Sequence, residues 1–130
     1  MEKKGLVLCD TNVVFKHLRG DTQITKELDK LGFSRLALSA ITVAETYFGM
    51  KKAEIRKTKE FINKFNVFLL DKNISLKFLE IVFAYRGQIQ IPDAIIAATA
   101  IETNLPLFTL NSKDFDFILG VKLYKPFYAL

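Results

Sequence analysis

The sequence contains no tryptophan, one cysteine, one histidine and only three prolines among its 130 residues. A single cysteine excludes a disulfide within the chain. One cysteine beside one histidine also excludes a zinc site of the Cys/His type. These scarcities favour a reducing compartment, so we expect a cytoplasmic protein.

Long hydrophobic runs are missing as well. The longest apolar segment, residues 94–101, contains Thr99 and is closed by Asp93 and Glu102. A membrane span needs about 20 apolar residues, so we expect none. The opening MEKKGLVLCDTN has two lysines but neither the long apolar region nor the cleavage site of a secretory signal, so no signal is expected.

The remaining composition is that of an ordinary folded domain. Hydrophobic residues make up 50% of the chain and charged residues 25%, which excludes a disordered chain. The length suits one domain with a core of its own, and no repeat or linker divides the chain. We therefore expect a single domain over residues 1–130.

Positive charge is concentrated in the first half of the chain. Residues 1–65 hold 13 Lys/Arg against 8 Asp/Glu, whereas residues 66–130 hold 6 of each. Six basic residues fall within 51–64 alone. A basic patch attracts the phosphates of a nucleic acid, but a solvated helix face would have the same composition.

Short apolar segments alternate with amphipathic ones along the chain. Strands are predicted at 6–10, 36–39, 67–70 and 107–109, with a possible fifth at 122–124. Helices are predicted at 13–19, 21–31, 41–48, 53–65, 75–85 and 92–103, with a helical turn near 113–117. This alternation is typical of an α/β fold with a parallel sheet, in which sites form at the carboxyl ends of the strands.

Four acidic residues follow predicted strands or lie in the early part of predicted helices: Asp10, Glu45, Asp93 and Asp114. Each comes from a different strand–helix unit, so the fold could gather them at one edge of the sheet. Carboxylates grouped without histidine are suitable ligands for Mg²⁺ or Mn²⁺. Such a cation supports hydrolysis of a phosphodiester by water.

Each acid also has a purely structural interpretation. Asp10 could cap the first helix, and Glu45 follows Thr42 by three positions, as in a capping box. Asp93 in a first helical turn would interact favourably with the helix dipole, and Asp114 could be an ordinary loop residue. The residues alone leave both interpretations open.

Four segments resemble, in order, the signatures of PIN-domain nucleases: LCDTNVVFKHL, LALSAITVAETYFGM, IPDAIIAATA and the T-x-N-x-x-D-F of TLNSKDF. The closing GVKLYKPF is similar to the family's last strand. Within the family, the chain most resembles the short VapC-type toxins of type II toxin–antitoxin pairs. The resemblance implies a PIN-like, three-layer α/β fold, with a five-stranded parallel sheet of order 3-2-1-4-5 flanked by helices.

The same resemblance implies a function. Its members are metal-dependent endoribonucleases that hydrolyse RNA with Mg²⁺ or Mn²⁺, usually as homodimers, and a cognate antitoxin protein holds them inactive. Two alternatives remain for this chain. One is an RNA-processing PIN nuclease that is not a toxin, and the other is a catalytically weak RNA-binding module.

Carried over to this sequence, the resemblance assigns Asp10, Glu45 and Asp93 to catalytic, metal-binding positions. The fourth acidic position falls on Asn111 or on Asp114. We expect Asp114 to fill it, with Asn111 assisting. The remaining supporting residues that it implies are Thr11, Asn12 and Thr109.

Several other residues receive no catalytic role. Cys9 is expected to be a buried apolar residue and His17 a lone histidine without a partner for chemistry. Lys16 and Arg19 follow the first motif and could contact RNA phosphates, an antitoxin or only solvent. The twelve phenylalanines are expected chiefly in the core, although a few near the first helices could form a dimer or antitoxin surface.

Overall fold

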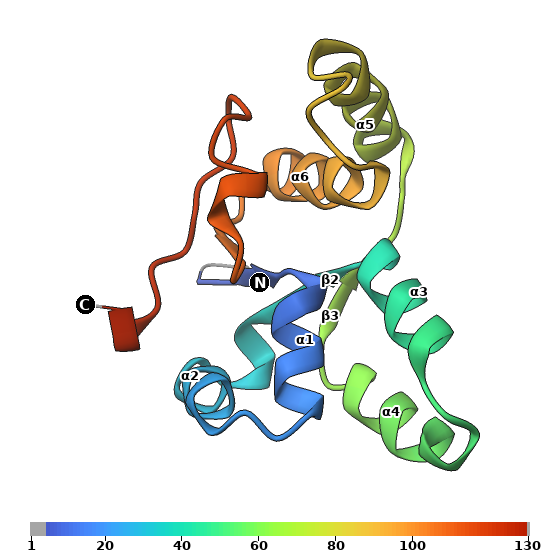
Figure 1. Cartoon of the computed structure of the whole chain (residues 1–130), viewed down its shortest axis with the longest axis vertical. Helices are drawn as coiled ribbons and strands as arrows, with labels where there is room; N and C mark the ends of the chain where they lie inside the picture. The colour runs from blue at the N-terminus through green and yellow to red at the C-terminus, as the bar shows by residue number, and fades with distance from the viewer. Residues whose placement is uncertain (1–4, 130) are drawn as a thin grey trace.

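The computed structural model describes residues 5–129, which form one parallel sheet with helices on both faces (Figure 1). The strands are β1 (Val7–Cys9), β2 (Leu36–Ser39), β3 (Asn66–Phe68) and β4 (Leu107–Phe108). The helices are α1 (Thr11–Leu18), α2 (Thr22–Leu31), α3 (Ala40–Gly49), α4 (Ile55–Ile62), α5 (Lys72–Ala84) and α6 (Ile91–Thr103). Between residues 5 and 129, no helix is long and apolar enough to cross a membrane.

The first strand shows why the sheet is covered on both faces. Leu6 and Leu8 belong to the core beneath α5 and α6, whereas Val7 and Cys9 belong to the core beneath α1, α2 and α4. Successive side chains of a strand point to opposite faces, so an apolar run buries both. Figure 1 shows α5 and α6 on one side and α1, α2 and α4 on the other. The predicted α/β fold with a parallel sheet is confirmed.

Capping residues set where the helices begin and end. The carboxylate of Asp71 accepts a hydrogen bond from the backbone N–H of Ile74 at 2.8 Å, so α5 begins at Lys72, three residues before the predicted start. The Asp21 carboxylate caps α2 in the same way, through the N–H of Ile24. Asn104 ends α6 in the left-handed conformation, with φ of 56°.

The prediction of five strands is wrong, since the described sheet has four, in the order β3-β2-β1-β4. The segment predicted as a fifth strand makes one parallel bridge, between Leu107 and Leu123. Beyond it the chain turns toward α2, where buried Glu27 accepts hydrogen bonds from the Tyr124 hydroxyl at 2.6 Å and the Phe127 N–H at 2.9 Å. The intervening Pro126 has no N–H to continue a ladder.

Candidate active site

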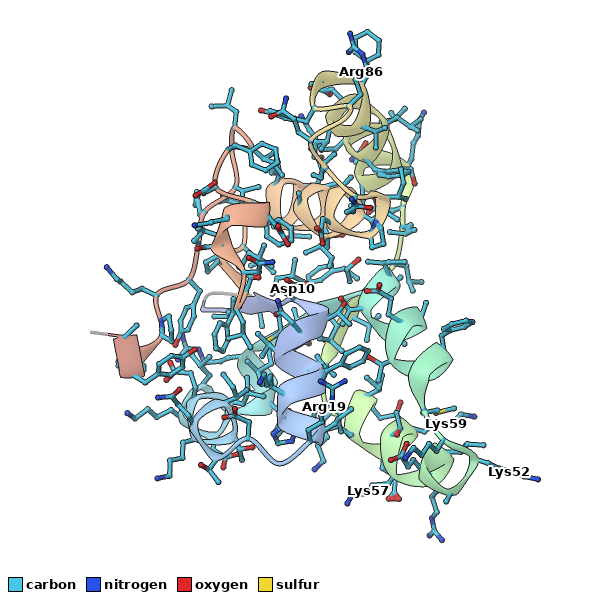
Figure 2. All side chains as sticks on the ribbon, in the orientation of Figure 1. Asp10, Arg19, Lys52, Lys57, Lys59 and Arg86 are labelled. Atoms are coloured by element: carbon cyan, nitrogen blue, oxygen red, sulfur yellow. The ribbon has the colours of Figure 1, made fainter. Side chains whose placement is uncertain are left out.

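Asp10 lies at the carboxyl end of β1 and is the N-cap of α1, at the end of that helix nearest α6 (Figure 2). Its two carboxylate oxygens accept hydrogen bonds from the Thr11 N–H and the Thr109 hydroxyl, both at 2.7 Å. The residue is only 6% exposed. Burial, above all, raises the pKa of Asp10. The two hydrogen bonds oppose this rise, and the charges of Glu45 and Asp114 add to it.

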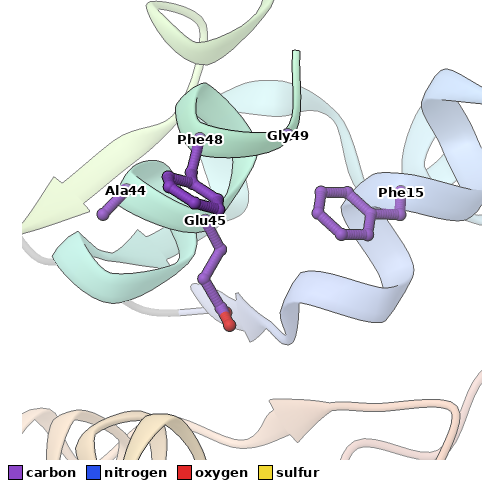
Figure 3. A pocket seen from close by; sticks show the side chains of 5 residues that line it. All are labelled: Phe15, Ala44, Glu45, Phe48 and Gly49. Atoms are coloured by element: carbon purple, nitrogen blue, oxygen red, sulfur yellow. The ribbon is translucent and has the colours of Figure 1, made fainter.

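Glu45 is joined to this site through a threonine of another helix. The hydroxyl of Thr11 donates to Oε1 of Glu45 at 2.7 Å and lies 2.9 Å from the hydroxyl of Thr42. The capping-box interpretation of Glu45 is wrong, because α3 begins at Ala40, with Ser39 as its N-cap. Glu45 therefore lies inside the helix, and Figure 3 shows its carboxylate directed away from the neighbouring phenyl rings.

Asp93 lies in the first turn of α6, where its charge interacts favourably with the helix dipole. Its pKa is raised to about 6 by burial, the largest cause, together with the charges of Asp10, Asp114 and Glu45, in that order. The carboxyl group of Asp93 therefore lies close enough to the other three predicted acids for their charges to shift its pKa. The fold brings together four residues that are far apart in the sequence.

Asp114 ends a short 3-10 helix, Ser112–Asp114, in the loop after β4. The side-chain amide of Asn111 donates to its carboxylate at 2.7 Å, so Asn111 lies beside Asp114 rather than in its place. The backbone N–H of Asn111 bonds to the Thr109 hydroxyl at 3.0 Å, and Asn12 on α1 accepts from the Leu110 N–H at 3.3 Å. The four predicted supporting residues all touch this acidic cluster or its loop.

The donor set fits a hydrated divalent cation. In the part of the chain that the structure describes, no three Asp, Glu, His or Cys side chains form a ready-made set of metal ligands. Mg²⁺ commonly keeps several waters and takes only one or two carboxylates directly, so spaced acids can serve. The raised pKa values of Asp10 and Asp93 reflect burial and mutual repulsion, and a cation among the four acids would relieve the repulsion.

Beside this acidic cluster lies a hollow of about 440 Å³, lined by Phe15, Ala44, Glu45, Phe48 and Gly49 (Figure 3). The sequence did not predict this hollow, because phenylalanines were expected chiefly in the core, whereas Phe48 is 95% exposed. The available signal was the position of Phe48, one turn after Glu45 and directly before a helix-ending glycine.

Comparison with known proteins places this arrangement in a family. The family model for the PIN domain matches residues 7–118. Ribonuclease VapC10 of Mycobacterium tuberculosis is 33% identical over 124 residues, covering 90% of this chain and 91% of that protein. Ribonuclease VapC1 of Methanocaldococcus jannaschii is 29% identical over 129 residues, covering 95% and 90%.

Solved structures agree with the sequence relatives. A toxin–antitoxin complex from Klebsiella pneumoniae has a chain that is 32% identical, with a TM-score of 0.77 and coverage of 88% of this chain and 94% of that one. A DNA-bound VapBC from Salmonella typhimurium, at 22% identity and a TM-score of 0.80, shares the fold over 92% and 96%. With four acids at one sheet edge and a family match across most of its length, this chain belongs to the PIN domain family and resembles its VapC members.

Proposed function

We propose that this protein is an endoribonuclease that hydrolyses RNA phosphodiester bonds with Mg²⁺ or Mn²⁺, and that it is the toxin of a toxin–antitoxin pair. The observation that carries the proposal is the convergence of four acids on one place, where the pKa of Asp93 rises to about 6. The ribonuclease names of the relatives and the toxin–antitoxin complex among similar structures support it. The proposed partners are RNA, an antitoxin and a second copy of the chain, in the cytoplasm.

The chain's own residues prepare the site. Asp10, Glu45, Asp93 and Asp114 would hold the cation, which supplies Lewis-acid stabilisation of the phosphodiester and activates water when it is bound. Thr109 fixes the Asp10 carboxylate, and Thr11 fixes that of Glu45. Asn111 does the same for Asp114. Carboxylates held by hydrogen bonds need little rearrangement when substrate arrives.

Attack by a protein nucleophile is poorly supported by the same structure. Cys9 is buried in β1, and burial raises the pKa of its thiol, so the reactive thiolate is disfavoured. His17 stacks on Phe61 and its Nδ1 lies 2.8 Å from the Thr25 hydroxyl. Neither residue is among the acids, and the nucleophile that we propose is water.

The test is cleavage of total RNA by the purified full chain, freed of any bound partner, in Mg²⁺, in Mn²⁺ or in EDTA. We expect metal-dependent cleavage that disappears in Asp93→Asn and persists in Asp116→Asn, a matched exposed aspartate outside the cluster. RNA binding without cleavage in either metal would contradict the proposal and support a binding module. If the protein cleaves RNA but no neighbouring gene encodes a small DNA-binding antitoxin, an RNA-processing enzyme would be supported instead.

A further inference from the structure

The hollow beside Glu45 presents two phenyl rings to solvent. Phe48 on α3 and Phe15 on α1 line it from opposite sides, and the Phe48 side chain packs against almost nothing (Figure 3). A Cβ atom added at Gly49 would lie 4.0 Å from the Phe15 ring, so a larger residue there would project into the opening. The groove is therefore largely apolar and open to solvent.

Charge changes sign along the helix that forms one wall of this groove. Asp10 begins α1, whereas Arg19 follows its other end, with its guanidinium 5.7 Å from the centre of the Phe15 ring. A second hollow, of about 470 Å³, lies at this end of α1, and its lining from the α4 region includes Lys57 and Lys64 together with one acid, Glu60. Figure 2 shows Arg19 and Lys57 near the end of α1 that is remote from Asp10.

We infer that this groove is a stacking subsite for single-stranded RNA, an inference that rests on the proposed function. A nucleobase next to the cleaved phosphate rests against Phe48 and Phe15, and the following phosphates pass Arg19, Lys57 and Lys64. Proteins bind unpaired nucleotides by stacking bases on aromatic side chains and pairing phosphates with cations. Every nucleotide supplies both groups, whereas a protein segment would need an apolar anchor and an acidic stretch in the same register.

The position of Phe48 relative to Glu45 links the subsite to the cleavage site. The two residues are three positions apart on α3, so their Cβ atoms are about 5–6 Å from each other on one rigid helix. A base held by Phe48 would bring its own phosphate toward Glu45 and the neighbouring acids. Phe48 is thus a positioning residue, and its loss is expected to raise KM more than it lowers kcat.

The experiment measures binding in EDTA, where the full chain cannot cleave. The probes are a labelled single-stranded oligouridine and an abasic ribose-phosphate strand of the same length, which has the charge without the bases. We expect Phe48→Leu to weaken binding of the oligouridine about tenfold and to leave the abasic strand unaffected. Phe48→Trp should preserve binding, and Gly49→Val should weaken it by narrowing the groove.

Phe127→Leu is the matched control, since Phe127 is an exposed phenylalanine in the C-terminal segment and contacts Lys30 instead. Equal binding of the oligouridine by the wild type and Phe48→Leu would overturn the inference. If Phe48→Leu instead lost affinity for the antitoxin alone, the groove would belong to a protein segment. These failures differ from failure of the proposed function, which would appear as a wild-type protein that cleaves no RNA in Mg²⁺ or Mn²⁺.

Discussion

Thr11 connects two parts of the candidate site through a single hydroxyl group. It donates to Glu45 and contacts Thr42, while its backbone N–H donates to Asp10. Thr11→Val would keep the shape and the backbone bond but leave Glu45 without its donor. We expect the variant to lose about 10–100-fold in metal affinity or activity, the range typical of residues that orient ligands. Thr22→Val, at an exposed threonine of α2, is the control and should cleave RNA like the wild type.

The charged carboxylate of Asp93 lowers the stability of the folded protein, and this effect can be measured without metal. Its pKa of about 6, against an ordinary 3.8, means that the folded protein tolerates the charged form less well than the unfolded chain does. Folding therefore loses stability as pH rises through the interval between about 4 and 6, and the loss is complete above it. In EDTA at pH 7, Asp93→Asn should raise Tm by a few degrees, as measured by thermal denaturation.

The pH dependence supplies the check on that result. The difference in Tm between Asp93→Asn and the wild type should shrink as pH falls from 7 toward 4, because the wild-type carboxyl becomes protonated. Asp116→Asn should show no such convergence. A metal-free Asp93→Asn protein that melts below the wild type at pH 7 would show that the carboxylate stabilises the fold, contrary to this account.

At the level of the elements, a buried carboxylate on α2 holds the last segment of the chain. Glu27 accepts from the Tyr124 hydroxyl, and burial, then this hydrogen bond, raises the pKa of that hydroxyl. Tyr124→Phe removes one hydrogen bond to a charged group. It should lower the free energy of unfolding by about 1.5–3 kcal/mol, as measured by urea denaturation.

The control for this prediction is Tyr128→Phe, at a partly exposed tyrosine of the same segment. Its unfolding midpoint should stay close to that of the wild type. Equal effects of the two substitutions would mean that Glu27 does not hold the segment through Tyr124. The result matters for the fold, because this attachment takes the residues after Tyr124 away from the sheet.

For the molecule as a whole, α5 presents an apolar face to solvent. Leu76, Leu79 and Phe83 all lie exposed, with Phe83 at 73%, and their spacing places them on one side of the helix. Exposed apolar surface of this kind commonly marks an interface. It is the surface that we expect the proposed homodimer to use.

Light scattering tests this expectation. The wild type should have about twice the chain mass of 14.8 kDa, and Leu79→Glu combined with Phe83→Glu should have the mass of one chain. Leu119→Glu, at an exposed leucine outside α5, should remain dimeric. A wild type with the mass of a single chain at micromolar concentration would contradict the homodimer.

Local sequence determined most of the elements and the approximate positions of the acids. Short apolar runs predicted four strands because a strand between two helical layers must be apolar on both faces. Pro92 predicted the start of α6 to within one residue, since its missing N–H is not needed there. Asp10 and Asp93 lie at the starts of helices, so their positions could be predicted from the sequence. Their catalytic roles remain predictions.

Contacts between residues that are distant in the sequence decided the hydrogen bonds of the site, the path of the last segment and the groove. No local sequence pattern encodes such contacts. Thr11 bonds Glu45 across 34 positions, and Glu27 holds Phe127 across 100. The groove joins Phe15 to Phe48 only because α1 and α3 pack together. Propensity and periodicity act over a few neighbouring residues, whereas hydrogen bonds and grooves depend on which elements pack side by side. The sequence by itself therefore determined the strands, the helices and the candidate acids, and the tertiary structure alone decided how the acids are held, how many strands pair and what lies beside them.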